Sequence, residues 1–488
     1  MTAAPVEAGV CIAGGGPAGT TLAIRLARLG HRVVLVDRGR ARPGHLGESL
    51  TAGVLTQLDL LGARDTIERA GFAEFRCLRT AWQDGTAAWR EFDGEAGLLV
   101  ERARFAAVLR DVARACGVRV LEPATIRESR YEAGRWHLRI GDAGSEIGVE
   151  AAVLALAGGR AATAARGRRA SDPRTLAVSG VWQGTALPTE PGIEAGISEW
   201  YWGMPLPDRR YGLTVFVDPR HFRGPAEPLP AAFARLVARS RLFGRCVGAP
   251  LVGGVYAADA TPYLDVAPAE RHMIKIGEAA LALDPLSSSG VQRAVQGALA
   301  AGVVINTLLK RPSDAATALA FYRHHLAAAA DRHRGWTAAF YGAAERQSRF
   351  WCDRASGGKK DDAAAPAPGA VAVPRPDLPI ALAGEARFAP TPCIVGDFVA
   401  MRPALHHPRL AEPVAFVAGH DLVPLLAQMM PGRTVMMAGA LVASWSGRVD
   451  LRPALAILEW LLQRGVLISP PHLEPPAPRM PTEGARAI

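Results

Sequence analysis

The sequence lacks the features of membrane-spanning, zinc-binding and disulfide-rich proteins. Its longest apolar run lies near residues 297–309 and includes Asn306, well short of the ~18 residues that a membrane-spanning helix needs. The six cysteines are scattered and none forms a CxxC pair, so we expect no disulfide framework and no metal site. The first nine residues do not resemble a signal peptide, and we therefore expect a cytoplasmic protein without membrane contact.

Lysine is rare as well, since the 488 residues contain only four, at positions 275, 310, 359 and 360. Arginine therefore supplies nearly all of the positive charge behind the net charge of +10. The length predicts two or three domains. One arginine cluster comprises Arg160, Arg166, Arg168, Arg169 and Arg174. It is either a solvated loop near cofactor phosphates or a docking surface for an acidic macromolecule.

The segment at residues 10–38 has the pattern of a dinucleotide-binding βαβ unit. An apolar strand at 10–13 leads into the glycine turn GGGPAG at 14–19, and a helical pattern at 20–29 is followed by a second apolar strand that closes at Asp37. Gly14 allows the tight turn, Gly16 lets the backbone approach a pyrophosphate, and Gly19 lets the helix pack on the strand. Asp37 is placed to accept hydrogen bonds from ribose hydroxyls.

Three later segments carry further candidate residues. Gly47-Glu48-Ser49 precedes an expected helix, so Ser49 is either a simple N-cap or part of a site in which Glu48 lies beside the cofactor ring. The run EWYWGMPL at 199–206 either packs a sheet face or walls a pocket for a flat substrate with Trp200 and Trp202. Residues 145–151 and 153–160 are expected to form two successive strands.

The C-terminal third has a different composition. Residues 355–379 are rich in alanine, proline and charged residues, which is typical of a linker. A small domain is expected at 380–469, with a helix–helix–strand pattern that resembles a winged helix, and the tail at 470–488 is proline-rich. The small domain has seven arginines against six acids, or only +1, which is a poor footprint for nucleic acid. We therefore expect a protein-contact module.

Several motifs together resemble FAD-dependent monooxygenases of the p-hydroxybenzoate hydroxylase fold. They are the glycine turn, the helix that begins near Arg102, VLALAGGR at 153–160 and GEAALALDPLSSSG at 277–290. The Gly47-Glu48-Ser49 stretch, the Trp200-x-Trp202-x-Met204-Pro205 pattern and Asp284-Pro285 are similar to the flavin-dependent halogenase branch. Within this group, DPLSSSGVQ and the added C-terminal domain most resemble the flavoprotein monooxygenases of tryptophylquinone cofactor biogenesis.

The resemblance implies an α/β protein with a Rossmann-like FAD-binding domain (6–60, 98–160 and 265–350) and an antiparallel β-sheet substrate domain (61–97 and 161–264). It places Gly277-Glu278 at the ribityl chain and residues 285–291 along the flavin ring. The FAD contacts expected in all are Gly14, Gly16, Pro17, Ala18, Gly19, Asp37, Arg38, Ser49, Arg102, Gly277, Glu278, Gly290 and Val291. Glu48, Trp200, Trp202 and Pro285 are the expected catalytic residues.

Three departures from the family pattern limit what it implies. Halogenases carry a catalytic lysine in the first substrate-facing segment, but residues 63–102 contain none. Residues 156–160 lack the aspartate of the Asp-Gly fingerprint linked to NAD(P)H, so the electron source is either NAD(P)H or a separate flavin reductase. Glu278 stands where the family has an aspartate, and its extra methylene should shift the ribityl contact without abolishing it.

These observations predict an FAD-dependent monooxygenase that uses molecular oxygen to hydroxylate an aromatic ring. The expected substrate is a peptidyl tryptophan in a small acidic protein or peptide, and two hydroxylations of one indole would give a tryptophylquinone precursor. The alternatives are a halogenase or hydroxylase of a small aromatic molecule, and a flavin-binding docking protein without activity. The missing lysine argues against halogenation, and the intact loop at 285–290 argues against a protein without activity.

Overall fold

The computed structural model describes residues 5–39, 47–83, 85–92, 94–142, 144–161, 167–170, 173–220, 222, 227–356 and 375–469. The chain divides into two compact units, Met1–Ala363 with Gly396–Val399, and Ala364–Val395 with Ala400–Ile488. The predicted linker lies mostly, and the predicted tail entirely, outside the described residues. The division of the first unit into FAD-binding and substrate domains stays a prediction.

A mixed sheet contains the predicted βαβ unit. In the described part of the chain its seven strands follow the order β8 (Arg119–Leu121), β2 (Val33–Val36), β1 (Val6–Ala13), β11 (Ser145–Leu156), β10 (Arg135–Asp142) and β9 (Ala124–Glu132), with β19 (Met273–Lys275) also paired to β11. β1, β2, β8, β11 and β19 are parallel, and β9 and β10 are antiparallel additions. The turn after β1 therefore lies at the carboxyl edge of the parallel strands, where ligands bind in such sheets.

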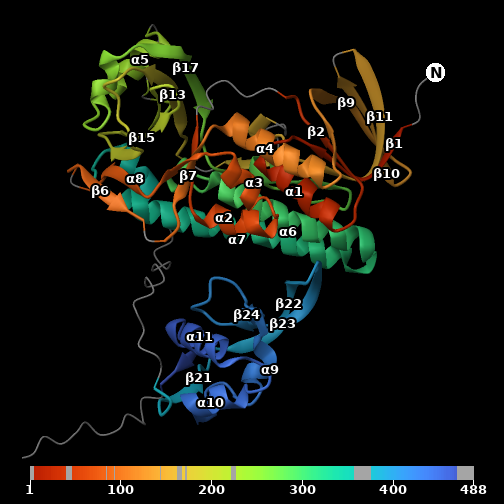
Figure 1. Cartoon of the computed structure of the whole chain (residues 1–488). Helices are drawn as coiled ribbons and strands as arrows, with labels where there is room; N and C mark the ends of the chain where they lie inside the picture. The colour runs from red at the N-terminus through yellow and green to blue at the C-terminus, as the bar shows by residue number, and fades with distance from the viewer. Residues whose placement is uncertain are drawn as a thin grey trace, which may run out of the picture. The chain divides into compact units, whose positions relative to one another are not determined.

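Helices cover this sheet and supply most of its core. Helix α1 (Pro17–Arg28) packs between the sheet and α6 (Gly290–Lys310), and α4 (Arg102–Ala115) also contacts α1. Leu22, Ile24 and Val295 have no exposed surface in this core, because apolar residues recur at helical spacing on the inward faces. Figure 1 shows the long helices α6 and α7 (Ala315–Gly342) running along one side of the unit. The predicted α/β fold class is confirmed.

A second sheet forms the other end of the first unit (Figure 1). Its seven strands within the described residues follow the order β17 (Leu251–Asp259), β13 (Leu176–Gln183), β16 (Arg210–Val217), β15 (Glu199–Leu206), β14 (Gly192–Ala195), β5 (Cys77–Ala81) and β6 (Ala88–Glu91). All neighbours are antiparallel except β14 and β5. Helix α5 (Leu229–Val237) packs on one face, and α8 (Arg349–Ala355) belongs to the cluster on the other. Because side chains alternate along a strand, Trp200 faces the α8 side and Tyr201 the α5 side.

Two local expectations are wrong. Residues 48–50 do not lead directly into a helix, because they form strand β3 (Glu48–Leu50), which pairs with β7 (Gly97–Val100). Ser49 lies opposite Leu99, and helix α2 (Gly53–Leu60) begins after Ala52, so Ser49 is not its cap. The two strands expected at 145–151 and 153–160 are one continuous strand, β11, which ends at Leu156. The remaining elements of the first unit are α3 (Arg64–Arg69), β4 (Ala73–Phe75), β12 (Arg168–Ala170), β18 (Tyr263–Asp265) and β20 (Leu281–Ala282).

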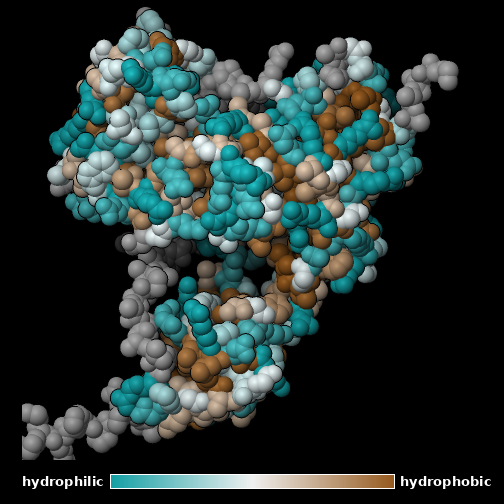
Figure 2. All heavy atoms as spheres, viewed as in Figure 1, coloured by the Kyte–Doolittle hydropathy of each residue, from teal (hydrophilic) through white to brown (hydrophobic). Residues whose placement is uncertain are grey.

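The second unit has its own core. Ile380, Leu422 and Ile457 have no exposed surface within it. Several apolar side chains stay exposed, among them Met430 at 59% and Leu451 at 68%, and Figure 2 shows hydrophobic residues grouped on the visible face of this unit. The comparison with a winged helix stays a prediction. The elements are β21 (Pro379–Leu382), β22 (Arg387–Val395), β23 (Phe398–His406), β24 (Phe416–Val417), β25 (His420–Asp421), α9 (Leu422–Leu426), β26 (Val435–Met437), α10 (Ala438–Ser444), α11 (Leu451–Gln463) and β27 (Leu467–Ile468). The first two residues of β23 are assigned to the first unit.

None of the helices in the described residues combines the length and the apolar character that crossing a bilayer requires.

Candidate active site

A cavity of about 600 Å³ opens at the carboxyl edge of the parallel strands. The glycine turn after β1, the end of β2, one face of α4 and the first residues of α6 surround it. Ten of the residues expected to contact FAD line this cavity, and so does Glu48, an expected catalytic residue. These ten are Gly14, Gly16, Pro17, Ala18, Asp37, Arg38, Arg102, Glu278, Gly290 and Val291.

Glycine is suited to each of the three motif positions for a different structural reason. Gly14 has φ +120°, and a Cβ there would lie 2.6 Å from the carbonyl of Ala157. A Cβ on Gly19 would lie 1.8 Å from the carbonyl oxygen of Gly14, so the fold itself requires both glycines. Gly16 has φ −75°, and its Cβ would meet no protein atom within 4 Å. The space beside Gly16 is thus open cavity at the amide end of α1, where anions bind.

Asp37 closes the turn as well as facing the cavity. Its carboxylate accepts hydrogen bonds from the backbone N–H of Gly15 at 2.5 Å and of Gly39 at 2.8 Å. A carboxylate has about four acceptor positions, so it retains capacity for ribose hydroxyls. Arg110 of α4 also lines the cavity and donates to the carbonyl of Gly15 at 3.1 Å. Sequence reasoning missed Arg110, although it follows Arg102 by eight residues on the same helix.

Glu48 and Arg102 form an ion pair on the cavity wall. Oε1 of Glu48 lies 3.6 Å from a guanidinium nitrogen of Arg102. Burial raises the pKa of the Glu48 carboxyl, an effect that the positive charge of Arg102 opposes. The other oxygen, Oε2, is buried without a hydrogen-bond partner. A buried acceptor without a partner is costly, so this oxygen is suited to accept a hydrogen bond from a ligand in the cavity.

Glu278 enters the cavity from the short helix η4 (Gly277–Ala279). Gly277 has φ +56°, and a Cβ there would lie 2.8 Å from Cβ of Ala18, so glycine brings η4 close to α1. Arg160 pairs with the Glu278 carboxylate at 3.2 Å, and its guanidinium lies over the ring of Tyr263. Arg160 itself is not part of the cavity lining, but its positive charge lies directly beside the carboxylate of Glu278, which is.

The predicted arginine cluster is not one continuous surface. Arg168 lies over the ring of Tyr263, 4.3 Å from its centroid, and donates to the carbonyl of Arg160. Arg169 and Arg174 are exposed, and Arg166 lies outside the described residues. Within the described part of the cluster, Arg160 and Arg168 are thus half-buried against Tyr263, and Arg169 and Arg174 face solvent.

The remaining predicted residues lie outside the cavity wall. Ser49 is buried in β3, and Pro285 begins the short helix η5 (Pro285–Ser287) just before α6. Trp200 is 1% exposed and stacks on Phe216, with ring centroids 3.8 Å apart. Trp202 is partly buried against the same cluster. The cavity lining does not include Gly19, Gly277, Ser49, Pro285, Trp200 or Trp202. The catalytic roles expected for Pro285, Trp200 and Trp202 therefore stay predictions.

Comparisons with known proteins show that this chain is similar to FAD-dependent oxidoreductases. A family model described as FAD dependent oxidoreductase matches residues 9–168. Tryptophan 2-halogenase of Chondromyces crocatus is 28% identical over 371 residues, which cover 71% of this chain and 70% of that protein. The flavin-dependent halogenase gsfI of Penicillium aethiopicum is 25% identical over 355 residues, or 63% of this chain and 66% of that protein.

Two solved structures match nearly the whole chain. The peptidyl tryptophan dihydroxylase QhpG, essential for tryptophylquinone cofactor biogenesis, superposes with a TM-score of 0.72 at 27% identity and covers 94% of this chain and 100% of its own. The flavin-dependent halogenase CmlS also gives 0.72, at 20% identity, over 95% of this chain and 96% of its own. The second match shows the fold alone.

The cavity fits FAD, the cofactor that these comparisons indicate. The open space at Gly16 suits a pyrophosphate on the α1 amides, and Oε2 of Glu48 offers an unused acceptor. The unpaired amides at the start of α6, where Gly290 and Val291 line the cavity, favour negative charge. Such charge develops on the flavin ring when it is reduced.

Proposed function

We propose that this chain, an FAD-dependent oxidoreductase of the superfamily that includes flavin monooxygenases and flavin-dependent halogenases, hydroxylates an aromatic ring. The substrate that we propose is a tryptophan side chain within a small acidic protein or peptide. Two relatives support an indole substrate, because the names of Tryptophan 2-halogenase and of the peptidyl tryptophan dihydroxylase QhpG both refer to tryptophan. The net charge of +10 supports an acidic partner.

The positions of the described lysines are the observation that favours hydroxylation over halogenation. Flavin-dependent halogenases, which this sequence resembles, use a lysine amine near the substrate. Here Nζ of Lys275 lies 2.7 Å from the fully buried carboxylate of Asp265, and Nζ of Lys310 donates to the carbonyl of Leu29 at 2.8 Å. Both described lysines are thus engaged elsewhere, and neither lines the cavity. Lys359 and Lys360 lie outside the described residues.

Halogenation is the second candidate, and one comparison favours it. Tryptophan 2-halogenase is 28% identical to this chain, and QhpG is 27% identical to it, so sequence identity does not separate the two activities. The two activities share the fold and the cofactor. The identity of the atom that is transferred therefore has to be measured directly.

In the proposed reaction, reduced FAD supplies two electrons for the activation of oxygen. One oxygen atom enters an aromatic C–H bond as a hydroxyl group, and the other leaves as water with two protons. The protein positions and desolvates the reacting groups. The glycine turn and α1 hold the pyrophosphate, Asp37 accepts from the ribose, and the start of α6 stabilises negative charge on the reduced ring. Glu48 accepts a hydrogen bond through Oε2.

The test is intact-mass analysis of candidate substrates after reaction with the FAD-loaded enzyme, a chemical reductant and ¹⁸O₂. Acidic tryptophan-containing polypeptides and free tryptophan are compared, each with and without chloride or bromide. We expect one or two ¹⁸O atoms in a polypeptide and no dependence on halide. Halogen incorporation would support the second candidate instead. Faster reaction of free tryptophan than of every polypeptide would contradict a peptidyl substrate.

A further inference from the structure

The carboxylate of Asp284 lies at the start of the loop that leads into α6. The residue is 7% exposed and caps η5, where its Oδ1 accepts from the backbone N–H of Leu286 at 3.0 Å. The loop continues through Ser288, which has φ +46°, to Gly290 and Val291 at the cavity wall. The left-handed conformation is uncommon for residues other than glycine and persists only where the surroundings enforce it.

Helix α7 supplies two of those enforcing contacts. The hydroxyl of Tyr341, a residue that is 2% exposed, lies 3.1 Å from each carboxylate oxygen of Asp284. The ring Nε2 of His333 lies 3.1 Å from the carbonyl oxygen of Asp284. In addition, Leu286 is buried in the cluster that contains Tyr341 and Trp200. The loop is therefore attached to α7 through side chain, backbone and apolar contacts.

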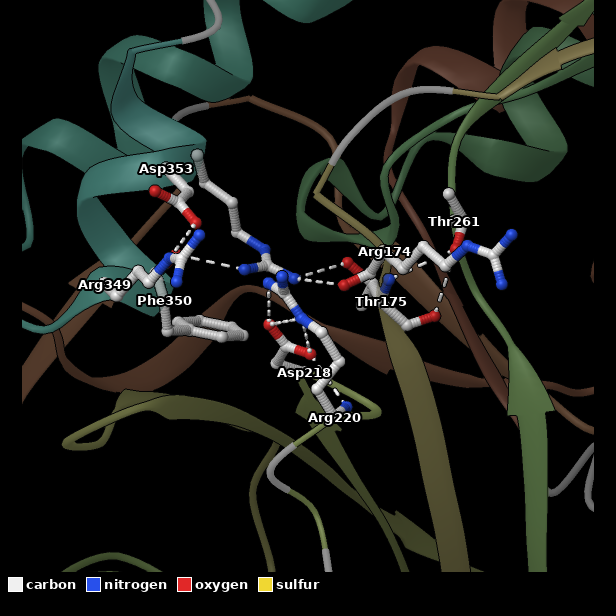
Figure 3. Close-up of polar contacts among 9 residues, drawn as sticks. Arg174, Thr175, Asp218, Arg220, Thr261, Arg349, Phe350 and Asp353 are labelled. Atoms are coloured by element: carbon white, nitrogen blue, oxygen red, sulfur yellow. Dashed lines mark hydrogen bonds and ion pairs between the residues drawn. The ribbon is translucent and has the colours of Figure 1, made fainter.

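Behind Tyr341 lies a buried arginine. Arg354 of α8 is 6% exposed, and its guanidinium donates to the carbonyl of Arg174 and to Oγ1 of Thr175, both at 2.8 Å. It lies 3.8 Å from the centroid of the Phe350 ring and 5.9 Å from that of Tyr341. In Figure 3, Phe350 lies to the left of Arg174 and Thr175, and Asp218 lies below them.

This arrangement gives Arg354 an electrostatic role towards Asp284. Burial raises the pKa of the Asp284 carboxyl, while the hydrogen bonds from Leu286 and Tyr341 and the positive charge of Arg354 oppose that rise. The same guanidinium ties α8 to the strand that begins after Thr175. One buried chain of contacts thus links the antiparallel sheet, α8, α7 and the loop at the cavity.

We propose that Asp284, Tyr341 and His333 are positioning residues that hold the Pro285–Ser289 loop so that the start of α6 faces the flavin. This positioning role depends on the FAD cofactor and not on the identity of the substrate, so it is the same in a hydroxylase and in a halogenase. Loss of the Tyr341 hydroxyl should loosen the loop without removing any residue of the cavity wall.

The test compares Tyr341→Phe with Tyr201→Phe. Tyr201 is a matched control, because its hydroxyl also bonds a buried carboxylate, that of Glu199 at 2.8 Å, but on the opposite face of the sheet. We expect Tyr341→Phe to bind FAD about tenfold more weakly, the scale of one hydrogen bond to a charged group. It should also change the visible circular dichroism of the bound flavin. In the FAD-free protein, amide hydrogen exchange should rise at residues 286–291 and stay unchanged in the glycine turn and the first turn of α1.

Equal effects of the two substitutions on FAD binding would overturn the proposal, because both would then act through general stability. Unchanged amide hydrogen exchange at residues 286–291 in Tyr341→Phe would overturn it as well. If Tyr341→Phe does not yield folded protein, His333→Leu removes the second α7 contact and is measured in the same way. The two proposals fail separately. If no peptidyl tryptophan is hydroxylated but Tyr341→Phe behaves as expected here, the positioning role of Asp284, Tyr341 and His333 still holds.

Discussion

Replacing Gly16 by aspartate should have opposite effects on the FAD-free and the FAD-bound protein. Gly16 is the N-cap of α1, has an ordinary φ of −75° and would place a Cβ where no protein atom lies within 4 Å. Aspartate is among the favoured N-cap residues because its side chain accepts from the first backbone N–H groups of the helix. The same carboxylate would occupy the space that we assign to the pyrophosphate.

The two effects can be sized. Without FAD, a better cap and the helix dipole together should raise the free energy of unfolding by about 0.5–1 kcal/mol. With FAD at one hundred times its dissociation constant, the wild type gains about 2.7 kcal/mol from binding, and the variant gains none. The order of stability should therefore reverse when FAD is added, with the wild type ahead by about 2 kcal/mol.

The assay is denaturant unfolding of both proteins with and without FAD, together with the visible flavin absorbance after gel filtration. Gly16→Ser is the neutral control, because it fills the same space without charge and should weaken FAD binding less. Gly14→Ala is the structural control and should lose both stability and FAD, since its Cβ would meet the carbonyl of Ala157. Normal FAD binding by Gly16→Asp would refute the assignment of the pyrophosphate to the α1 amides.

Two further predictions concern pH and salt. Burial lowers the pKa of His333 to about 4 from 6.5, so the stability it contributes is complete above pH 6.5 and is lost as the pH falls from 6.5 to about 4. Between pH 7.5 and 5, denaturant unfolding of His333→Gln should therefore show about 2 kcal/mol less loss of stability than the wild type, and equal losses would contradict the burial argument. If the partner is acidic, its dissociation constant measured by titration should rise steadily as ionic strength passes roughly 0.15 M, whereas a constant value would exclude electrostatic steering.

Local patterns in the sequence were enough to predict the core of the fold. The glycine turn, the helix after it and the strand ending at Asp37 are contiguous. Gly19 is constrained by Gly14 within the same turn, and Gly14 by Ala157, which directly follows the adjacent strand. The Rossmann-like sheet as a whole and the antiparallel sheet of the substrate domain were expected from the family resemblance and not from periodicity. Eleven predicted site residues were brought to one cavity wall because strand ends and helix starts meet at one edge of a parallel sheet.

Long-range pairing decided what the sequence could not. Ser49 looked like a helix cap, but Leu99 pairs with it across a strand ladder, and a three-residue strand has no periodicity to detect. Trp200 was a candidate for a pocket wall, but it stacks on Phe216 in the cluster that includes α8. The sequence did not show which face of β15 would carry it. Arg110 and Tyr341 carried no motif, because their partners Gly15 and Asp284 lie 95 and 57 residues away. Contacts over such distances depend on how the layers pack, and that is a property of the tertiary structure.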